Sequence, residues 1–270
     1  MKKEMSFLVS SSLIFVLFLT LSGLFAGMLS YVFYYAAFLI PISLYFVLCK
    51  YGKIGVSHLG VKLKSENTVL TLPLIFPTLL CIFVISFLTE LILSRFTEPP
   101  VAQIQDNFLI SLLTHALFPA LFEEILFRYI PISLLLPYGK KTAILYSSVL
   151  FALIHCSLYQ IPYAFFAGLV FAFVDISFES IIPSVIFHFI NNAVSIVWMR
   201  GSSERTFVLI FMITLSLCAA LSALFIFVKR EKYRKILTDM RTDTKCGKFT
   251  AEFIVLIILL LSIAFINAFM

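Results

Sequence analysis

Charged residues are scarce in this sequence of 270 residues, and the scarcity limits the class of protein. Only 13% of the residues are Asp, Glu, Lys or Arg, whereas 61% are hydrophobic. Soluble domains contain about 45–50% apolar residues, so this composition argues against a soluble enzyme or binding module. The longest polar stretch, residues 229–250, is too short to build a separate soluble domain. The composition therefore predicts an integral membrane protein.

Several common site motifs are also missing. The five cysteines stand singly, without a CxxC pair, which argues against a disulfide framework and a thiolate metal site. The sequence has no HExxH, no GxSxG and no glycine-rich phosphate loop. Ser184 lies near His188, but no orienting acid stands beside it in the sequence, which disfavours serine chemistry. The sequence has no internal repeat and no matched pair of broken helices, which argues against an inverted-repeat transporter.

Long apolar runs dominate the sequence instead. Only helices and closed barrels satisfy every backbone polar group in lipid, and these runs are continuous rather than alternating. The sequence therefore predicts an all-α, polytopic transmembrane bundle of eight or nine helices. The runs 142–158 and 161–177 are short for a full crossing, so the number could be eight. The predicted helices cover residues 6–26, 29–49, 69–94, 108–136, 142–158, 161–177, 180–199, 206–228 and 251–269.

The net charge of +6 comes from basic residues in the short connections between these runs. That placement is typical of topology signals in a lipid bilayer and argues against nucleic-acid binding. If the helices alternate in direction, the basic connections fall on one side, which we expect to be the cytoplasm. We therefore predict a multi-pass protein of a bacterial plasma membrane with its N-terminus in the cytoplasm and, with nine spans, its C-terminus outside. The basic connections are Lys2–Lys3, residues 50–64, Lys140–Lys141 and residues 229–248.

Both of the longer basic connections are expected to be solvated loops. They are residues 52–67, which are punctuated by glycine, and residues 229–248. Basic segments beside a membrane commonly meet anionic lipid without a further role.

Three ionisable side chains interrupt the apolar run of residues 108–136. They are Glu123, Glu124 and Arg128. An ionisable group at mid-bilayer costs about 2.5–3.5 kcal/mol on insertion scales, so three together need partners and indicate a functional site. Residues four apart lie on one helix face, which pairs Glu124 with Arg128 and leaves Glu123 rotated by about 100°.

Two of the four histidines complete helical i, i+4 patterns. These are Phe151-x-x-x-His155 and His188-x-x-x-Asn192. Counted along the helices from the nearest connections, both histidines reach about the depth of the Glu pair at 1.5 Å per residue. The sequence thus predicts that several polar side chains from separate helices meet in one buried layer.

The other two histidines carry less information. His58 lies in a basic connection and is expected to be a loop residue. His115 precedes the Glu pair by about two helical turns, and we expect a structural hydrogen-bonding role for it.

A carboxylate and two imidazoles around a water-accessible point can activate water and stabilise an oxyanion, as peptide hydrolysis requires. The same groups allow a second interpretation, in which Glu123, His155 and His188 hold Zn²⁺ with an open water position. The position of Asn192 beside His188 favours an oxyanion site over a metal shell.

Three motifs in order, Glu123-Glu124-x-x-x-Arg128, Phe151-x-x-x-His155 and His188-x-x-x-Asn192, resemble those of the CPBP family of intramembrane proteases. That family includes the Rce1-type CAAX prenyl endopeptidases and the bacterial Abi proteins of bacteriocin processing and self-immunity. The segment Leu59-Gly60-Val61 also resembles one found upstream in the family.

The resemblance implies an intramembrane endopeptidase acting on a membrane-associated or lipidated protein or peptide. It implies that Glu123 is the general base, that His155 assists or holds the water, and that His188 and Asn192 stabilise the oxyanion. Glu124, Arg128 and Phe151 would support them, and the family is sometimes described as a metalloprotease. On this basis, residues 108–200 form the catalytic segment, flanked by transmembrane segments 1–107 and 201–270.

Two other functions remain open from the sequence. A non-catalytic immunity or scaffold protein of the same fold would bind a bacteriocin, leader peptide or partner, and would tolerate Glu123→Gln. A proton-coupled transporter would use Glu123 and His155 as a relay, and its flux would depend on a proton gradient.

Overall fold

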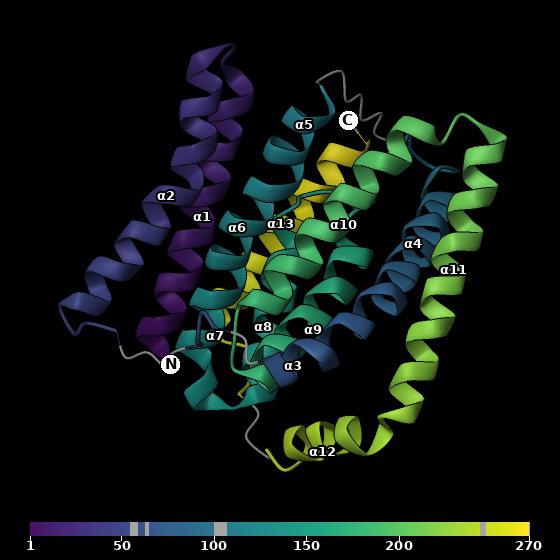
Figure 1. Cartoon of the computed structure of the whole chain (residues 1–270). Helices are drawn as coiled ribbons and strands as arrows, with labels where there is room; N and C mark the ends of the chain where they lie inside the picture. The colour runs from purple at the N-terminus through teal and green to yellow at the C-terminus, as the bar shows by residue number, and fades with distance from the viewer. Residues whose placement is uncertain (55–58, 63–64, 100–106, 244–246, 270) are drawn as a thin grey trace.

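A computed structural model describes residues 1–54, 59–62, 65–99, 107–243 and 247–269 of the chain (Figure 1). These residues form helices throughout and no β-strand; a single isolated bridge joins Gly60 to Ser180. His58 and Cys246 lie outside the described residues. The prediction of an all-α, polytopic bundle is confirmed.

Eight segments among the described residues are long and apolar enough to cross a membrane. This agrees with the lower of the two predicted numbers. The remaining predicted span is α8 (Lys140–Leu153), which has only 14 residues. The eight segments are α1 (Lys2–Leu24), α2 (Met28–Lys50), Asn67–Leu93, Phe108–Tyr138, α9 (Ile161–Phe178), α10 (Ile182–Gly201), α11 (Arg205–Val228) and α13 (Ala251–Phe269).

Two of the eight segments are composite. Asn67–Leu93 contains the end of α3 (Ser65–Thr71), a 3₁₀ turn and α4 (Ile75–Leu93). Phe108–Tyr138 contains α5 (Phe108–Ser111), α6 (Phe118–Glu124) and α7 (Ile130–Leu135), joined by π-helical turns at Leu112–Leu117 and Ile125–Tyr129. The Glu pair therefore lies at the end of a short α-helical stretch between two widened turns.

Pro131 contributes to the irregularity that follows the Glu pair. It has no N–H to offer the carbonyl of Phe127, four residues earlier. The guanidinium of Arg128 donates to that carbonyl instead, at 3.0 Å. The carbonyl oxygen of Phe127 is therefore available to accept a hydrogen bond from Arg128 of the first motif.

The helix that carries the second motif ends earlier than predicted. The sequence predicted a helix over residues 142–158, whereas α8 stops at Leu153 and His155 lies in the turn that follows. Cys156 adopts φ +47°, a left-handed conformation that cannot continue an α-helix. The i, i+4 relation nevertheless survives, because the Nδ1 atom of His155 lies 2.7 Å from the carbonyl oxygen of Phe151.

Helices α8 and α9 pack closely as a hairpin, and Gly168 makes this approach possible. A Cβ atom at that position would lie 3.0 Å from the Cα of Ser148. The buried apolar side chains form two groups, and residues of α9 belong to both. One group includes residues of α1, α2, α7, α8 and α13, and the other includes residues of α4, α9, α10 and α11.

The two chain ends lie at opposite ends of the bundle (Figure 1). The segment after α11 was expected to be a solvated loop, but it contains an amphipathic helix, α12 (Arg230–Arg241). Tyr233, Ile236 and Met240 lie on one face of this helix at spacings of three and four residues. Ile236 packs against the bundle and Met240 is buried, which explains why the segment folds against the protein.

The other basic connection is also more ordered than a solvated loop where it is described. Leu59 is buried, and the N–H of Gly60 donates to the carbonyl of Glu179 at 2.9 Å. The carbonyl of Gly60 accepts from Ile181 at 3.1 Å. These two bonds attach the connection to the turn that leads into α10.

Candidate active site

The polar layer surrounds a cavity of about 370 Å³ in the middle of the bundle. Glu123, Phe151, His155, His188 and Asn192 all line it. They come from α6, α8, the turn after α8, and α10. The structure thus brings together residues of all three motifs, while Glu124 and Arg128 lie buried behind the cavity wall.

A buried chain of three charged or polar groups forms the base of the site. The Nδ1 atom of His188 lies 2.8 Å from Oε1 of Glu124, and Oε2 of the same carboxylate lies 3.6 Å from Nε of Arg128. The Glu124 and Arg128 side chains have no exposed surface. A buried charge requires a partner, and each of these residues supplies one to the other. The predicted i, i+4 pair is confirmed.

Arg128 is held from several directions. Its Nη1 atom donates to the carbonyls of Phe127 and Ser147, and its guanidinium lies 4.1 Å from the centre of the Phe151 ring. A guanidinium over an aromatic face is stabilised by the electrons of the ring. Phe151, the first residue of the second motif, therefore covers the guanidinium of the first motif.

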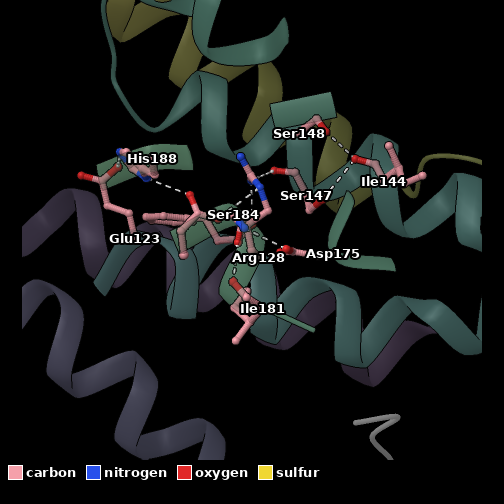
Figure 2. A network of polar contacts seen from close by, with 11 residues as sticks. Glu123, Arg128, Ile144, Ser147, Ser148, Asp175, Ile181, Ser184 and His188 are labelled. Carbon is pink, nitrogen blue, oxygen red and sulfur yellow. Dashed lines mark hydrogen bonds and ion pairs between the residues drawn. The ribbon is translucent and has the colours of Figure 1, made fainter. Parts of the chain in front are cut away.

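Glu123 faces a different direction from Glu124, as the helical geometry predicted. Its side chain is 17% exposed, and its Oε2 atom lies 3.9 Å from Nε2 of His188. Figure 2 shows the two side chains next to each other, with Arg128 deeper in the network. The Glu124 carboxylate is thus held in an ion pair, whereas the Glu123 carboxylate lies at the cavity.

His155 reaches the cavity from the turn after α8. A carbonyl oxygen can only accept a hydrogen bond, so the contact between Nδ1 and Phe151 O places a proton on Nδ1. In the neutral ring, Nε2 is then the acceptor. This nitrogen is suited to accept a hydrogen bond from a water molecule in the cavity.

Asn192 is oriented by its neighbour in sequence. The side-chain amide of Asn191 donates to Oδ1 of Asn192 at 3.3 Å, and both residues line the cavity. With its oxygen accepting this bond, Asn192 presents its NH₂ group as a donor. Asn191 was not predicted as a site residue, although it stands directly before one.

Asp175 is a further residue that the sequence analysis missed. It is fully buried in α9, and its Oδ1 atom accepts from the backbone N–H of Ser184 at 3.0 Å. Ser184 lies in the first turn of α10, where N–H groups lack partners within the helix. Asp175 therefore caps the helix that carries His188. A single Asp in an apolar run, without a partner at i±4, gave no signal for this contact.

Zinc coordination by Glu123, His155 and His188 was the alternative interpretation of the site. These side chains are donor types that zinc uses. Among the described residues, however, no three His, Cys, Asp or Glu side chains are grouped so that they could hold a metal ion. Zinc binding by Glu123, His155 and His188 stays a prediction that metal analysis can test.

Ser184 and His115 can also be placed. The hydroxyl of Ser184 donates to the carbonyl of Ile181 at 3.0 Å, a local helix contact rather than a nucleophile arrangement. His115, for which a structural role was expected, lines the cavity and is exposed.

Comparisons with known proteins support one family. Residues 105–194 match the model of a family described as type II CAAX prenyl endopeptidase Rce1-like. The match includes all three motifs and confirms the resemblance found in the sequence. No curated protein matches the chain, and no solved structure matches it either. The chain is thus a multi-pass membrane protein whose motif-bearing segment is Rce1-like.

Proposed function

We propose that the protein is an intramembrane endopeptidase that hydrolyses a peptide bond with a water molecule activated by Glu123. One observation carries this proposal. Glu124 is fully buried in an ion pair, whereas the adjacent Glu123 lies at a cavity with His155, His188 and Asn192. A general base must be accessible to water and close to groups that stabilise the developing charge.

The chemistry begins with a water molecule between Glu123 and His155. Nε2 of His155 accepts a hydrogen bond from the water, and the Glu123 carboxylate removes a proton as the water oxygen attacks the carbonyl carbon of the substrate. This step forms a C–O bond and moves the carbonyl π electrons onto the oxygen. The product is a tetrahedral intermediate with one negative charge.

Donors on α10 stabilise that charge. The NH₂ group of Asn192 donates to the oxyanion, and Nε2 of His188, when protonated, donates to it from the same helix face. The Nδ1 contact with Glu124 orients the His188 ring so that Nε2 faces Glu123. The intermediate collapses when Glu123 returns its proton to the amide nitrogen, the C–N bond breaks, and an acid and an amine are released.

Cleavage of a panel of membrane-delivered peptides by purified protein tests this function. The wild type is compared with Glu123→Gln, each with and without a strong zinc chelator. Glu231→Gln, which changes an exposed carboxylate on α12, is the matched control. We expect cleavage by the wild type and the control, a rate about 10²–10⁴-fold lower for Glu123→Gln, and no effect of the chelator.

Two results would contradict the proposal. Cleavage by Glu123→Gln at the wild-type rate would remove the general base from the mechanism. If no peptide is cut, but wild type and Glu123→Gln both protect cells against a peptide toxin, the protein is a non-catalytic immunity or scaffold protein.

A further inference from the structure

We infer that Asn267, near the end of α13, is a positioning residue for His155. Its side-chain amide donates to the backbone carbonyl of Cys156, the residue that follows His155, at 3.0 Å. This bond holds the turn after α8 in the conformation that keeps the His155 ring at the cavity. The effect of Asn267 on peptide cleavage rests on the proposed function, whereas its effect on the His155 ring does not.

Helix α8 alone does not fix His155. The helix ends at Leu153, two residues before the histidine, so the His155 backbone belongs to the turn that follows. One local contact remains, between Nδ1 of His155 and the carbonyl oxygen of Phe151 at 2.7 Å. The ring can keep this contact only while the turn stays folded over the end of the helix. The conformation of the turn therefore decides where Nε2 points.

That conformation depends on Cys156, whose φ of +47° is left-handed. Residues other than glycine rarely adopt it, and it persists only where the surrounding structure holds it. Two hydrogen bonds do so here. The N–H of Cys156 donates to the carbonyl of Leu153 at 3.0 Å, and its carbonyl accepts from Asn267. The two bonds fix the peptide groups on either side of Cys156, one of which joins it to His155.

The turn also borders a second cavity, of about 370 Å³. His155, Cys156 and Asn267 all line it. Close packing immobilises side chains and backbone in a protein interior. Among the described residues, packing holds the turn only weakly on this side, because the turn faces open space there. Without the Asn267 bond, the turn would have room to shift and to carry His155 with it.

A second contact ties the same turn to α4. The hydroxyl of Tyr159 donates to the carbonyl of Thr97 and lies 2.9 Å from the hydroxyl of Thr97. The N–H of Thr97 in turn donates to the carbonyl of Leu93, the last residue of α4. Tyr159 stands four residues after His155, whereas the Asn267 bond reaches the very next residue. Asn267 is therefore the contact that controls the histidine most directly.

Helix α13 is placed to make this contact because it follows α8 along its length. Near the start of both helices, the ring centres of Tyr146 and Phe253 lie 4.4 Å apart, and the N–H of Thr250 donates to the Tyr146 hydroxyl. Near their ends, Asn267 reaches Cys156. The two helices thus run in the same direction, and α13 ends at the end of the bundle that carries the C-terminus (Figure 1).

Asn267 acts from outside the site that the three motifs define. It does not line the cavity of Glu123, so it reaches His155 only through the turn. It also stands outside residues 105–194, the segment that matches the family model. The inference therefore assigns the C-terminal helix a role in the geometry of the candidate active site.

Kinetics of Asn267→Ala test this role. We expect kcat to fall about 10–100-fold with KM unchanged, since misplacing a reacting group by about 1 Å can cost about 10²-fold. Asn267→Gln keeps the donor and should recover part of kcat. Ser262→Ala is the matched control, because Ser262 is exposed on the same helix and its hydroxyl donates to Ile258 within α13. It should behave as the wild type, and thermal unfolding should show that all variants are folded.

Nuclear magnetic resonance of protein labelled with ¹⁵N-histidine tests the position of the ring without requiring activity. The chain has four histidines, so the His155 signals can be assigned by comparison with His155→Gln. The wild type should show His155 with its proton on Nδ1. In Asn267→Ala these signals should move towards the other tautomer or broaden, whereas those of His188 should stay. Ser262→Ala should leave both histidines unchanged.

Three results would overturn the inference. They are a wild-type kcat in Asn267→Ala, an unchanged His155 signal despite a lower kcat, and a fall in kcat that only matches a loss of folded protein. If Asn267→Ala does not fold, Asn267→Asp replaces it, because a carboxylate of the same shape cannot donate to the Cys156 carbonyl. If the wild type cuts no peptide, the proposed function is wrong, and the His155 signal alone decides whether Asn267 positions the ring.

Discussion

The imidazole of His188 lies between the two adjacent glutamates, with Nδ1 2.8 Å from Glu124 and Nε2 3.9 Å from Glu123. Both glutamates belong to one motif, yet the ring contacts them through different nitrogens. Glu124 fixes the ring, because it is buried and paired with Arg128. Glu123 is left with the partly exposed position, at the cavity, from which a proton can be exchanged with water.

Glu123→Gln is expected to lower the cleavage rate by about 10²–10⁴-fold, the usual contribution of a general base. The amide keeps the shape of the side chain but cannot accept the proton of the attacking water. The rate and the thermal unfolding of the variant should be measured together. An equal fall in both the rate and the folded fraction would assign Glu123 a structural role.

The buried ion pair of Glu124 and Arg128 is expected to contribute to the stability of the fold. Removing one partner of a buried ion pair typically costs about 3–5 kcal/mol, because the other charge remains buried without compensation. Glu124→Gln and Arg128→Met should each lower the temperature of thermal unfolding, and the double variant should recover part of the loss. Additive losses would show that the two side chains are not coupled. Activity should remain low in Glu124→Gln and in the double variant, because Gln no longer holds the His188 ring as the carboxylate does.

Asp175 is expected to act as a positioning residue through α10. Asp175→Ala removes the acceptor for the Ser184 N–H, and loss of such a cap costs about 0.5–2 kcal/mol. Asp175→Asn keeps an acceptor oxygen and should restore stability. If the charge also orients Arg128, Asp175→Asn will still have a reduced kcat with KM unchanged. Full recovery of kcat in Asp175→Asn would limit the residue to capping.

Gly168→Ala is expected to destabilise the protein by about 1–3 kcal/mol, the usual effect of overpacking. The added methyl group would approach the backbone of Ser148 on α8 to 3.0 Å. Gly23→Ala is the matched control, since nothing lies within 4 Å of a Cβ atom at that position in α1. A residue change from Gly to Ala favours a helix by about 1 kcal/mol, so the control should be neutral or stabilised. Equal behaviour of the two variants in thermal unfolding would contradict the close approach of α8 and α9.

Metal removal is expected to leave the cleavage rate unchanged. The mechanism assigns water activation to Glu123 and the stabilisation of charge to His188 and Asn192, without a metal ion. Dialysis against a strong chelator, followed by metal analysis and an activity assay, checks this. Loss of activity that returns with Zn²⁺ would move Glu123, His155 and His188 to the alternative role of zinc ligands.

Much of the fold could be predicted because lipid imposes simple rules. A continuous apolar run of sufficient length must be helical, and the span positions follow from the run lengths. The common depth of Glu123, His155 and His188 could also be predicted, since it depends only on helix rise and on the position of the connections. The pairing of Glu124 with Arg128 is likewise a local property of one helix.

The missed features depend on contacts between distant segments or on local irregularities. Asp175 caps a helix that begins after a turn, and its partner Ser184 is identified only when that turn is built. Helix α12 folds because Ile236 packs against the bundle and Met240 is buried. The polar composition of the segment gave no indication of this packing. The early end of α8 follows from a left-handed residue, Cys156, whose type does not usually favour that conformation.

Fully buried side chains of α7 and α8 also bear on whether protons could leak across a membrane through this protein. A water-filled cavity that reached both faces of a membrane would conduct protons and dissipate the electrochemical gradient. Here His188 lines the cavity, whereas the side chains of Ile130, Ile132, Leu134 and Tyr146 do not and have no exposed surface. The same side chains that pack beside the ion pair therefore insulate the candidate active site electrically from that end of the bundle.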